Sequence, residues 1–156
     1  MTVPPYGFIS YAHDDAALFA AFRKDVSAVE ARFGMKFHED TGIAAGTVID
    51  PAIQAMIAQA HVFILLASRS FVASGYVRDI ELPAIETRRK AAKGLVIPVV
   101  LEECAHDLIG RGLQAVPKVG GRVKPICQFT RRAAGCDLAR QQIDIAIGRH
   151  YGVPMP

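Results

Sequence analysis

Long apolar runs are absent from this sequence of 156 residues. The longest apolar stretch, His61 to Ala67, is far shorter than the ~20 residues that a membrane-spanning helix needs. No basic segment near the N-terminus leads into an apolar stretch, so a secretory signal is not predicted. The three cysteines show no CxxC spacing, which is typical of reduced thiols in a cytosolic protein. We therefore expect a cytoplasmic protein without membrane contact.

Nucleotide-cradling glycine loops are also missing. The sequence contains neither GxGxxG after a predicted strand nor GxxxxGK[ST], which excludes both common phosphate-binding turns. A phospho-receiver domain would place an aspartate at the end of the third strand, where this chain has Leu66-Ala67-Ser68. The acidic pair Asp14-Asp15 therefore does not indicate a receiver domain.

Charge is unevenly distributed along the chain. Residues 1–78 carry six Lys or Arg and seven Asp or Glu, a balance of −1, whereas residues 79–156 carry twelve and eight, a balance of +4. Such an excess usually lies on solvated loops and helix faces, and the alternative is contact with an anionic ligand or partner. Aromatic residues are not interleaved with the basic ones, so the pattern does not predict nucleic-acid binding.

Apolar segments alternate with helical patterns throughout the chain. Helices are expected after Asp14 or Asp15, after Asp50-Pro51, over 76–91 with an interruption at Pro83, and after Asp137. The predicted strands are Tyr6 to Tyr11, Met35 to His38, His61 to Ala67, Leu95 to Leu101 and Val123 to Phe129. This order predicts a three-layer, flavodoxin-like α/β fold with a five-stranded parallel sheet and helices on both faces.

The domain organisation follows from the same pattern. We expect a single domain over residues 1–152 and a frayed tail over 153–156. Pro98 cannot donate to a strand ladder, which indicates a sheet edge or a bulge at that position. Ligands of parallel α/β sheets gather outside the carboxyl ends of the strands, where Ser10-Tyr11, Glu39-Asp40 and Ser68 are expected.

Two segments at this edge resemble boxes of the Toll/interleukin-1 receptor (TIR) domain family. Phe8-Ile9-Ser10-Tyr11 resembles the first box, and residues 68–82 resemble the segment that carries the catalytic glutamate of the NAD-cleaving bacterial members. Residues 37–46 resemble the second strand and the loop that follows it, and 94–101 the next strand. The resemblance thus covers nearly the whole chain.

The resemblance implies a function for Glu81. Many bacterial TIR domains cleave NAD+ at the nicotinamide–ribose bond, giving nicotinamide plus ADP-ribose or a cyclic isomer, and Glu81 matches their catalytic carboxylate. A fixed negative charge stabilises the oxocarbenium-like ribose that forms as nicotinamide leaves. Asp79 lies two residues away, about 200° around a helix, so both carboxylates cannot face one pocket. The alternative for Glu81 is a solvated helix glutamate.

The resemblance also implies substrate-binding residues. Ser10, Tyr11 and His13 match the region that lines the nucleotide side of the pocket, although His13 also fits a capping or surface role. Ala45 and Gly46 match the loop position where backbone approaches the ligand or a neighbouring subunit, and a plain turn is the alternative. Tyr76 stands near the usual tryptophan as a wall of the nicotinamide pocket, with a core aromatic as the alternative.

Cofactors, metals and partners complete the expectation. No cofactor is expected beyond NAD+ as substrate, and residues 102–107 lack the paired ligand spacing of a metal site. The resemblance implies homotypic TIR–TIR assembly, a sensor or effector domain or protein as a further partner, and a role in antiphage defence or signalling. Two alternatives stay open: a non-catalytic TIR interaction module, and a nucleoside-ribosyl-transferring relative that shares the sheet.

Overall fold

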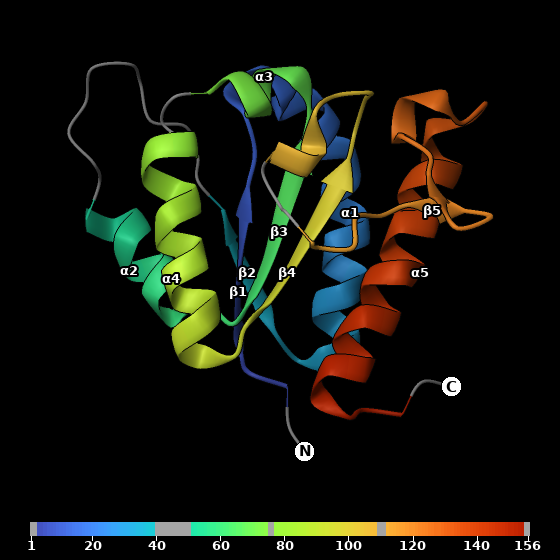
Figure 1. Ribbon diagram of the computed structural model, residues 1–156. Helices are drawn as coiled ribbons and strands as arrows, with labels where there is room; N and C mark the ends of the chain where they lie inside the picture. Colours follow the sequence, from blue (N-terminus) through green and yellow to red (C-terminus); the bar gives the residue numbers. More distant parts are fainter. Residues whose placement is uncertain (1–2, 40–50, 75–76, 109–111, 155–156) are drawn as a thin grey trace.

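The computed structural model describes residues 3–39, 51–74, 77–108 and 112–154, which form a sheet with helices on both faces (Figure 1). The sheet contains four parallel strands in the order β2-β1-β3-β4. Their bounds are β1 (Tyr6–Ser10), β2 (Lys36–Glu39), β3 (Val62–Ala67) and β4 (Leu95–Val100). Every residue of β3 is buried, as expected for a central strand that is covered on both faces.

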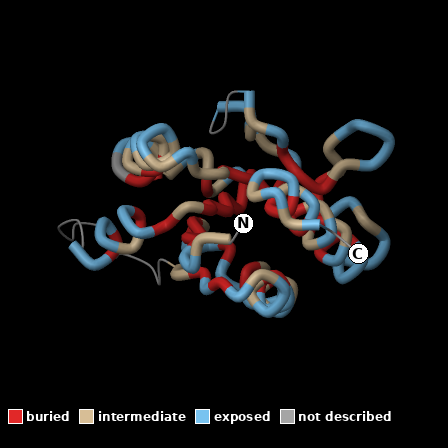
Figure 2. The backbone as a smooth tube through the Cα atoms, turned by 90° about the horizontal axis from the view of Figure 1, so that it is seen from below, coloured by how far each residue is buried: buried red, intermediate tan, exposed pale blue. Residues whose placement is uncertain are grey.

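The helices divide between the two faces of the sheet. Helices α1 (Ala16–Phe33) and α5 (Arg132–Tyr151) cover one face, and α2 (Pro51–Gln59) and α4 (Leu82–Ala92) cover the other (Figure 1). A hydrophobic core lies on each face of the sheet, and alternate residues of β3 belong to one or the other. Ile64 packs on the α1–α5 side and Phe63 on the α2–α4 side. Buried segments accordingly concentrate between the helix layers (Figure 2). The predicted three-layer α/β fold is confirmed.

Several local signals act as expected from the sequence. Gly34 ends α1 in the left-handed conformation, with φ of +64°. Pro51 is the first residue of α2, where its missing N–H costs nothing. Pro83 stands in the first turn of α4, and the turn before it, η2 (Val77–Glu81), is a π-helix. The interruption predicted at Pro83 is thus a change of helix type that ends at Glu81.

The fifth strand predicted over 123–129 is wrong. Lys118–Val119 (β5) and Arg122–Val123 (β6) pair as a small antiparallel ribbon, and Ile126–Gln128 (η4) form a 3₁₀ turn. Pro125 lacks an N–H for a strand ladder, and Ile126 is buried beneath Gly135 of α5. The segment therefore packs on α5, and its one backbone hydrogen bond toward the sheet among the described residues runs from the Cys127 N–H to the carbonyl of Leu101, just after β4, at 3.0 Å.

Pro98 does lie at a sheet edge. The N–H groups of Leu95 and Leu101 donate to the β3 side of β4, so the alternate residues between them direct their backbone groups outward. Among the described residues, the chain returns beside this edge at Val116, whose N–H donates to the Pro98 carbonyl at 2.9 Å. The proline therefore removes no hydrogen bond from the sheet.

Two expected helix caps are also corrected. Helix α5 begins at Arg132 instead of after Asp137, which lies inside the helix and pairs with Arg140. Asp15 does occupy the position before α1, but its side chain makes no capping hydrogen bond there. Among the described segments, no helix is both long and apolar enough to cross a membrane.

Candidate functional site

A serine and a glutamate meet at the carboxyl ends of the strands. Ser10 is the last residue of β1, and Glu81 is the last residue of the π-helical turn before α4. The Ser10 hydroxyl donates a hydrogen bond to Oε2 of Glu81, joining residues 71 positions apart in the sequence. The fold therefore brings together two of the residues that the sequence resemblance assigned to a single site.

Both partners of this contact are withdrawn from solvent. Ser10 is 0% exposed and Glu81 only 1% exposed. Burial of an ionised carboxylate is costly unless hydrogen bonds satisfy it, and a hydroxyl donor supplies part of that stabilisation. The arrangement fixes the position of a carboxylate beside the sheet edge. A carboxylate held in this way can stabilise a positively charged transition state.

A second serine–carboxylate pair lies beside the first. Ser68, directly after β3, donates from its hydroxyl to Asp15 and accepts from the Phe71 N–H at 3.0 Å. Burial raises the pKa of Asp15 above its ordinary value, and the hydrogen bond from Ser68 opposes that rise. The carboxylate that the sequence suggested as a cap for α1 therefore fastens the turn after β1 to the turn after β3.

Further contacts tie in the neighbouring segments. The Ser70 hydroxyl donates to Asp14 at 3.3 Å, and the backbone N–H of Arg69 donates to Oε1 of Glu102 at 2.8 Å. Helix α3 (Arg69–Ala73) is thereby joined to the segments that follow β1 and β4. Sequence reasoning did not assign these roles to Asp15 and Glu102. The available signal was their position, since each follows an apolar strand within a few residues.

Tyr11 and His13 follow Ser10 in the chain and differ in burial. The Tyr11 ring stacks on Phe19 of α1, with ring centroids 4.4 Å apart, and packs against the α1–α5 core. His13 is exposed in the short turn η1 (His13–Asp15), and its side chain forms no hydrogen bond or ion pair with another described residue.

The remaining predicted site residues cannot be placed. Ala45, Gly46 and Tyr76 lie outside the described residues, so their assignments stay predictions. Within the described part of the chain, no group of three or more His, Cys, Asp or Glu residues is arranged to hold a metal ion. Of the predicted binding set, Ser10 is thus in hydrogen-bond contact with Glu81.

Known proteins similar to this chain were found at the levels of family, sequence and fold. One sequence relative is the uncharacterised protein y4lF of Sinorhizobium fredii. The two sequences are 35% identical over 127 aligned residues, which cover 80% of this chain. The chain spans only 38% of the length of that relative.

Two solved structures are similar in fold. One contains the TIR domain heterodimer of RPS4 and RRS1, at 14% identity and a TM-score of 0.54, covering 95% of this chain and 99% of that one. The other is the TIR domain of the Toll-related receptor TRR-2 from Hydra magnipapillata, at 15% identity and a TM-score of 0.43, covering 70% and 82%. The profile of the family described as TIR domain matches residues 8–127, from within β1 to beyond the small ribbon. This chain belongs to the TIR domain family.

Proposed function

We propose that this TIR domain cleaves NAD+ at the nicotinamide–ribose bond, with Glu81 as the catalytic carboxylate. The observation that carries the proposal is the buried contact between Ser10 and Glu81 at the carboxyl ends of the strands. Ligands of parallel α/β sheets bind at that edge. A carboxylate held there has the charge that a ribosyl cation requires in its transition state.

The reaction needs no metal and no activated nucleophile on the protein. The bond between ribose C1′ and the pyridinium nitrogen breaks, and its electron pair passes to nitrogen, so nicotinamide leaves as a neutral molecule. The ribose becomes an oxocarbenium-like cation that Glu81 stabilises. Water then adds to C1′ and loses a proton, which gives ADP-ribose, whereas attack by an adenine nitrogen gives a cyclic product.

Ser10 has a supporting role in this proposal. Its hydroxyl fixes one carboxylate oxygen of Glu81 through the buried hydrogen bond. A catalytic group that is held in position loses less entropy when substrate binds. Because Glu81 is 1% exposed, we expect the isolated domain to turn over slowly and activity to rise when domains assemble. Use of the reaction in bacterial antiphage defence or signalling is part of the same proposal.

The test is nicotinamide release from NAD+ by the purified chain, resolved by chromatography, in dilute solution and on a multivalent scaffold. We expect Glu81→Gln, which removes the charge but keeps the shape, to lower the rate by about 100-fold or more. Glu86→Gln is the matched control, since Glu86 lies on α4 with a side chain 45% exposed and should leave the rate unchanged. Equal rates for Glu81→Gln and the wild type would assign catalysis elsewhere.

The second candidate function is an interaction module without turnover. The near-complete burial of Glu81 favours it, because a buried carboxylate that is hydrogen-bonded to Ser10 can have a purely structural role. The RPS4 and RRS1 domains, which share the fold, form a heterodimer. A scaffolded wild-type domain that assembles yet releases no nicotinamide would support this function and contradict the first.

A further inference from the structure

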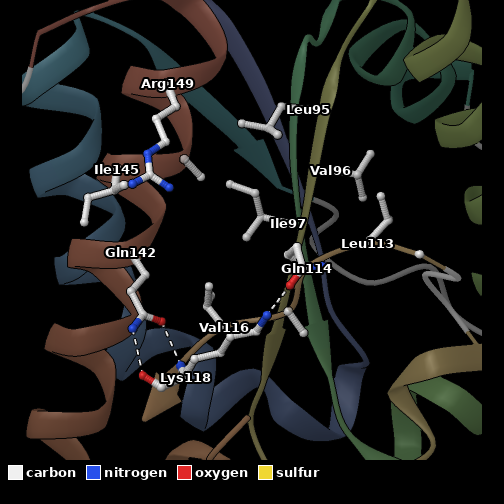
Figure 3. A pocket seen from close by; sticks show the side chains of 13 residues that line it. Leu95, Val96, Ile97, Leu113, Gln114, Val116, Lys118, Gln142, Ile145 and Arg149 are labelled. Atoms are coloured by element: carbon white, nitrogen blue, oxygen red, sulfur yellow. Dashed lines mark hydrogen bonds between the residues drawn. The ribbon is translucent and has the colours of Figure 1, made fainter. Parts of the chain in front are cut away.

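A hollow of about 650 Å³ lies between the outer edge of β4 and helix α5 (Figure 3). Its walls come from the first half of β4, from residues 112–118 and from α5 between Gln142 and Arg149. It opens because the returning chain pairs with β4 at one bridge, Val99 with Val116. Among the described residues, no other segment therefore pairs with the outer edge of the first half of β4.

The hollow is separate from the Ser10–Glu81 contact. Leu95 to Ile97 are paired with Val62 to Ile64, at the beginning of the strands. Ser10 ends β1 at the opposite, carboxyl edge of the sheet. Of the predicted NAD-site residues that the structure describes, none lines the hollow. An activity of this surface therefore does not depend on the proposed cleavage of NAD+.

The floor and walls are largely apolar. Leu95 and Ile97 of β4 face Ile145 of α5 across the space, and Leu113 lies beside β4 (Figure 3). Ile145 is 41% exposed, one of four large apolar side chains that are exposed among the described residues. A volume of this size with mainly apolar walls matches the sites that bury small organic ligands.

The polar groups of the hollow carry one sign of charge. Lys118 and Arg149 line it, and no Asp or Glu is present among the described residues of its wall. Gln142 is already occupied, because its amide accepts from the Lys118 N–H and donates to the Lys118 carbonyl, both at 2.8 Å. The Lys118 ammonium in turn donates to Gln114.

Arg149 is the cation left for a ligand. Its side chain runs along the α5 wall and its guanidinium lies beside Ile145 (Figure 3). Among the described residues its guanidinium makes no hydrogen bond or ion pair, whereas Arg32 of α1 and Arg140 of α5 both pair with Asp144. A guanidinium presents two parallel N–H groups that match a carboxylate.

We propose that this hollow binds a small amphipathic carboxylate, whose apolar body packs between β4 and α5 and whose charged group pairs with Arg149. An added peptide strand fits the site poorly. Within the described strand β4, Val96 is the residue that has both an N–H and a C=O directed outward there, because Pro98 has no N–H and Val116 occupies the edge beyond it. Backbone pairing of that kind needs several successive free groups.

The probe for the test is octanoate, titrated below its micelle concentration, with octanol as the neutral analogue of equal length. Binding is followed by calorimetry and by backbone amide NMR shifts. We expect octanoate to bind at least about five-fold more tightly than octanol. The shifts should be confined to residues 95–97, 112–118 and 142–149.

Variants separate the charge from the cavity. Arg149→Gln should weaken octanoate binding about ten-fold and leave octanol binding unchanged. Ala146→Leu, which fills the wall, should weaken both ligands. Arg131→Gln, at the other end of α5, is the control and should change neither. Circular dichroism of each variant verifies folding, so that a loss of binding is not a loss of structure.

Three results would overturn the proposal. The first is the absence of octanoate-dependent shifts in the hollow of the folded wild type. The second is equal binding of octanoate to the wild type and to Arg149→Gln. The third is concentration-dependent dimerisation in sedimentation that Ile145→Asp abolishes, which would assign the hollow to contact between copies of this chain.

Discussion

At the scale of single residues, Ser68 connects three segments with one hydroxyl. It donates to Asp15 after β1, accepts from the Phe71 N–H in α3, and is 0% exposed at the end of β3. A buried group that loses its partner bears the full cost of its desolvation, so one small side chain can influence the whole edge of the sheet. Its position beside the Ser10–Glu81 contact makes this influence relevant to the proposed site.

Ser68→Ala should lower the free energy of unfolding by about 1–3 kcal/mol, because it removes a helix cap and leaves Asp15 without its hydroxyl donor. The pKa of Asp15 should rise further, since the Ser68 hydrogen bond now opposes the effect of burial. Urea unfolding and NMR titration of the Asp15 carboxyl measure the two effects.

The matched control for that substitution is Ser70→Ala. Ser70 lies in the same helix and makes a longer, exposed contact with Asp14. We expect its loss to change the free energy of unfolding by no more than about 0.5 kcal/mol. Equal effects of the two substitutions would show that the buried Ser68 hydrogen bonds contribute nothing beyond an ordinary surface contact.

At the scale of elements, the pairing of β1 with β2 places a glycine opposite a phenylalanine. Gly7 pairs with Phe37, and a Cβ on Gly7 would stand 2.3 Å from a Phe37 ring carbon and 2.9 Å from the Val62 carbonyl oxygen. Phe37 is itself buried in the α1–α5 core. The missing side chain of Gly7 thus gives room for the ring that anchors the outermost described strand on this side.

Gly7→Ala should therefore destabilise the domain by about 1–3 kcal/mol through overpacking. A partner substitution, Phe37→Leu, shortens the side chain that the new methyl would meet. In a double-mutant cycle measured by urea unfolding, we expect the two changes together to cost less than the sum of each alone. Strict additivity would contradict a direct clash between the two positions.

The elements also show which parts of the fold are local. Gly34 and Pro51 set helix boundaries that are visible in the sequence, because left-handed backbone and a missing N–H are properties of the residue itself. The predicted strand over 123–129 failed for a non-local reason. Its Ile126 packs against Gly135 of α5, and no periodicity within the segment records that contact.

At the scale of the whole molecule, α1 and α5 are joined through a buried acid. Asp144 of α5 is 2% exposed and pairs with Arg32 of α1 at 3.3 Å and with Arg140 at 2.9 Å. Asp25 approaches the same Arg140 at 3.9 Å. Burial raises the pKa of Asp144 above its ordinary value of 3.8, and the two arginines oppose that rise.

This raised pKa makes the contribution of Asp144 to stability depend on pH. The folded state holds the proton more tightly than the unfolded state, so the contribution is complete below 3.8 and is lost as pH rises through the folded pKa. As the pH falls from about 7.5 to about 4.5, the free energy of unfolding of the wild type should therefore rise relative to that of Asp144→Asn. Urea unfolding of both proteins at the two pH values measures it.

Asp137→Asn on the same helix is the control with the opposite sign. The pKa of Asp137 is lowered, first by its hydrogen bond from Arg140, so its contribution is present above 3.8 and is lost as pH falls below it. The stability difference between the wild type and Asp137→Asn should therefore stay constant from about pH 7.5 to about pH 4.5 and shrink only below 3.8. A wild-type advantage over Asp144→Asn that shrinks in the same direction would contradict the raised pKa of Asp144.

The sequence by itself determined the alternation of strands and helices, the helix boundaries at Gly34 and Pro51, and the resemblance that directed attention to Glu81. These follow from backbone preferences and apolar spacing, which act over a few residues. Only the tertiary structure decided that Ser10 bonds Glu81, that the Asp15 side chain accepts from Ser68 instead of capping α1, and that Arg149 lines an open hollow. Each of these depends on segments far apart in the chain, which packing alone brings within the reach of a hydrogen bond.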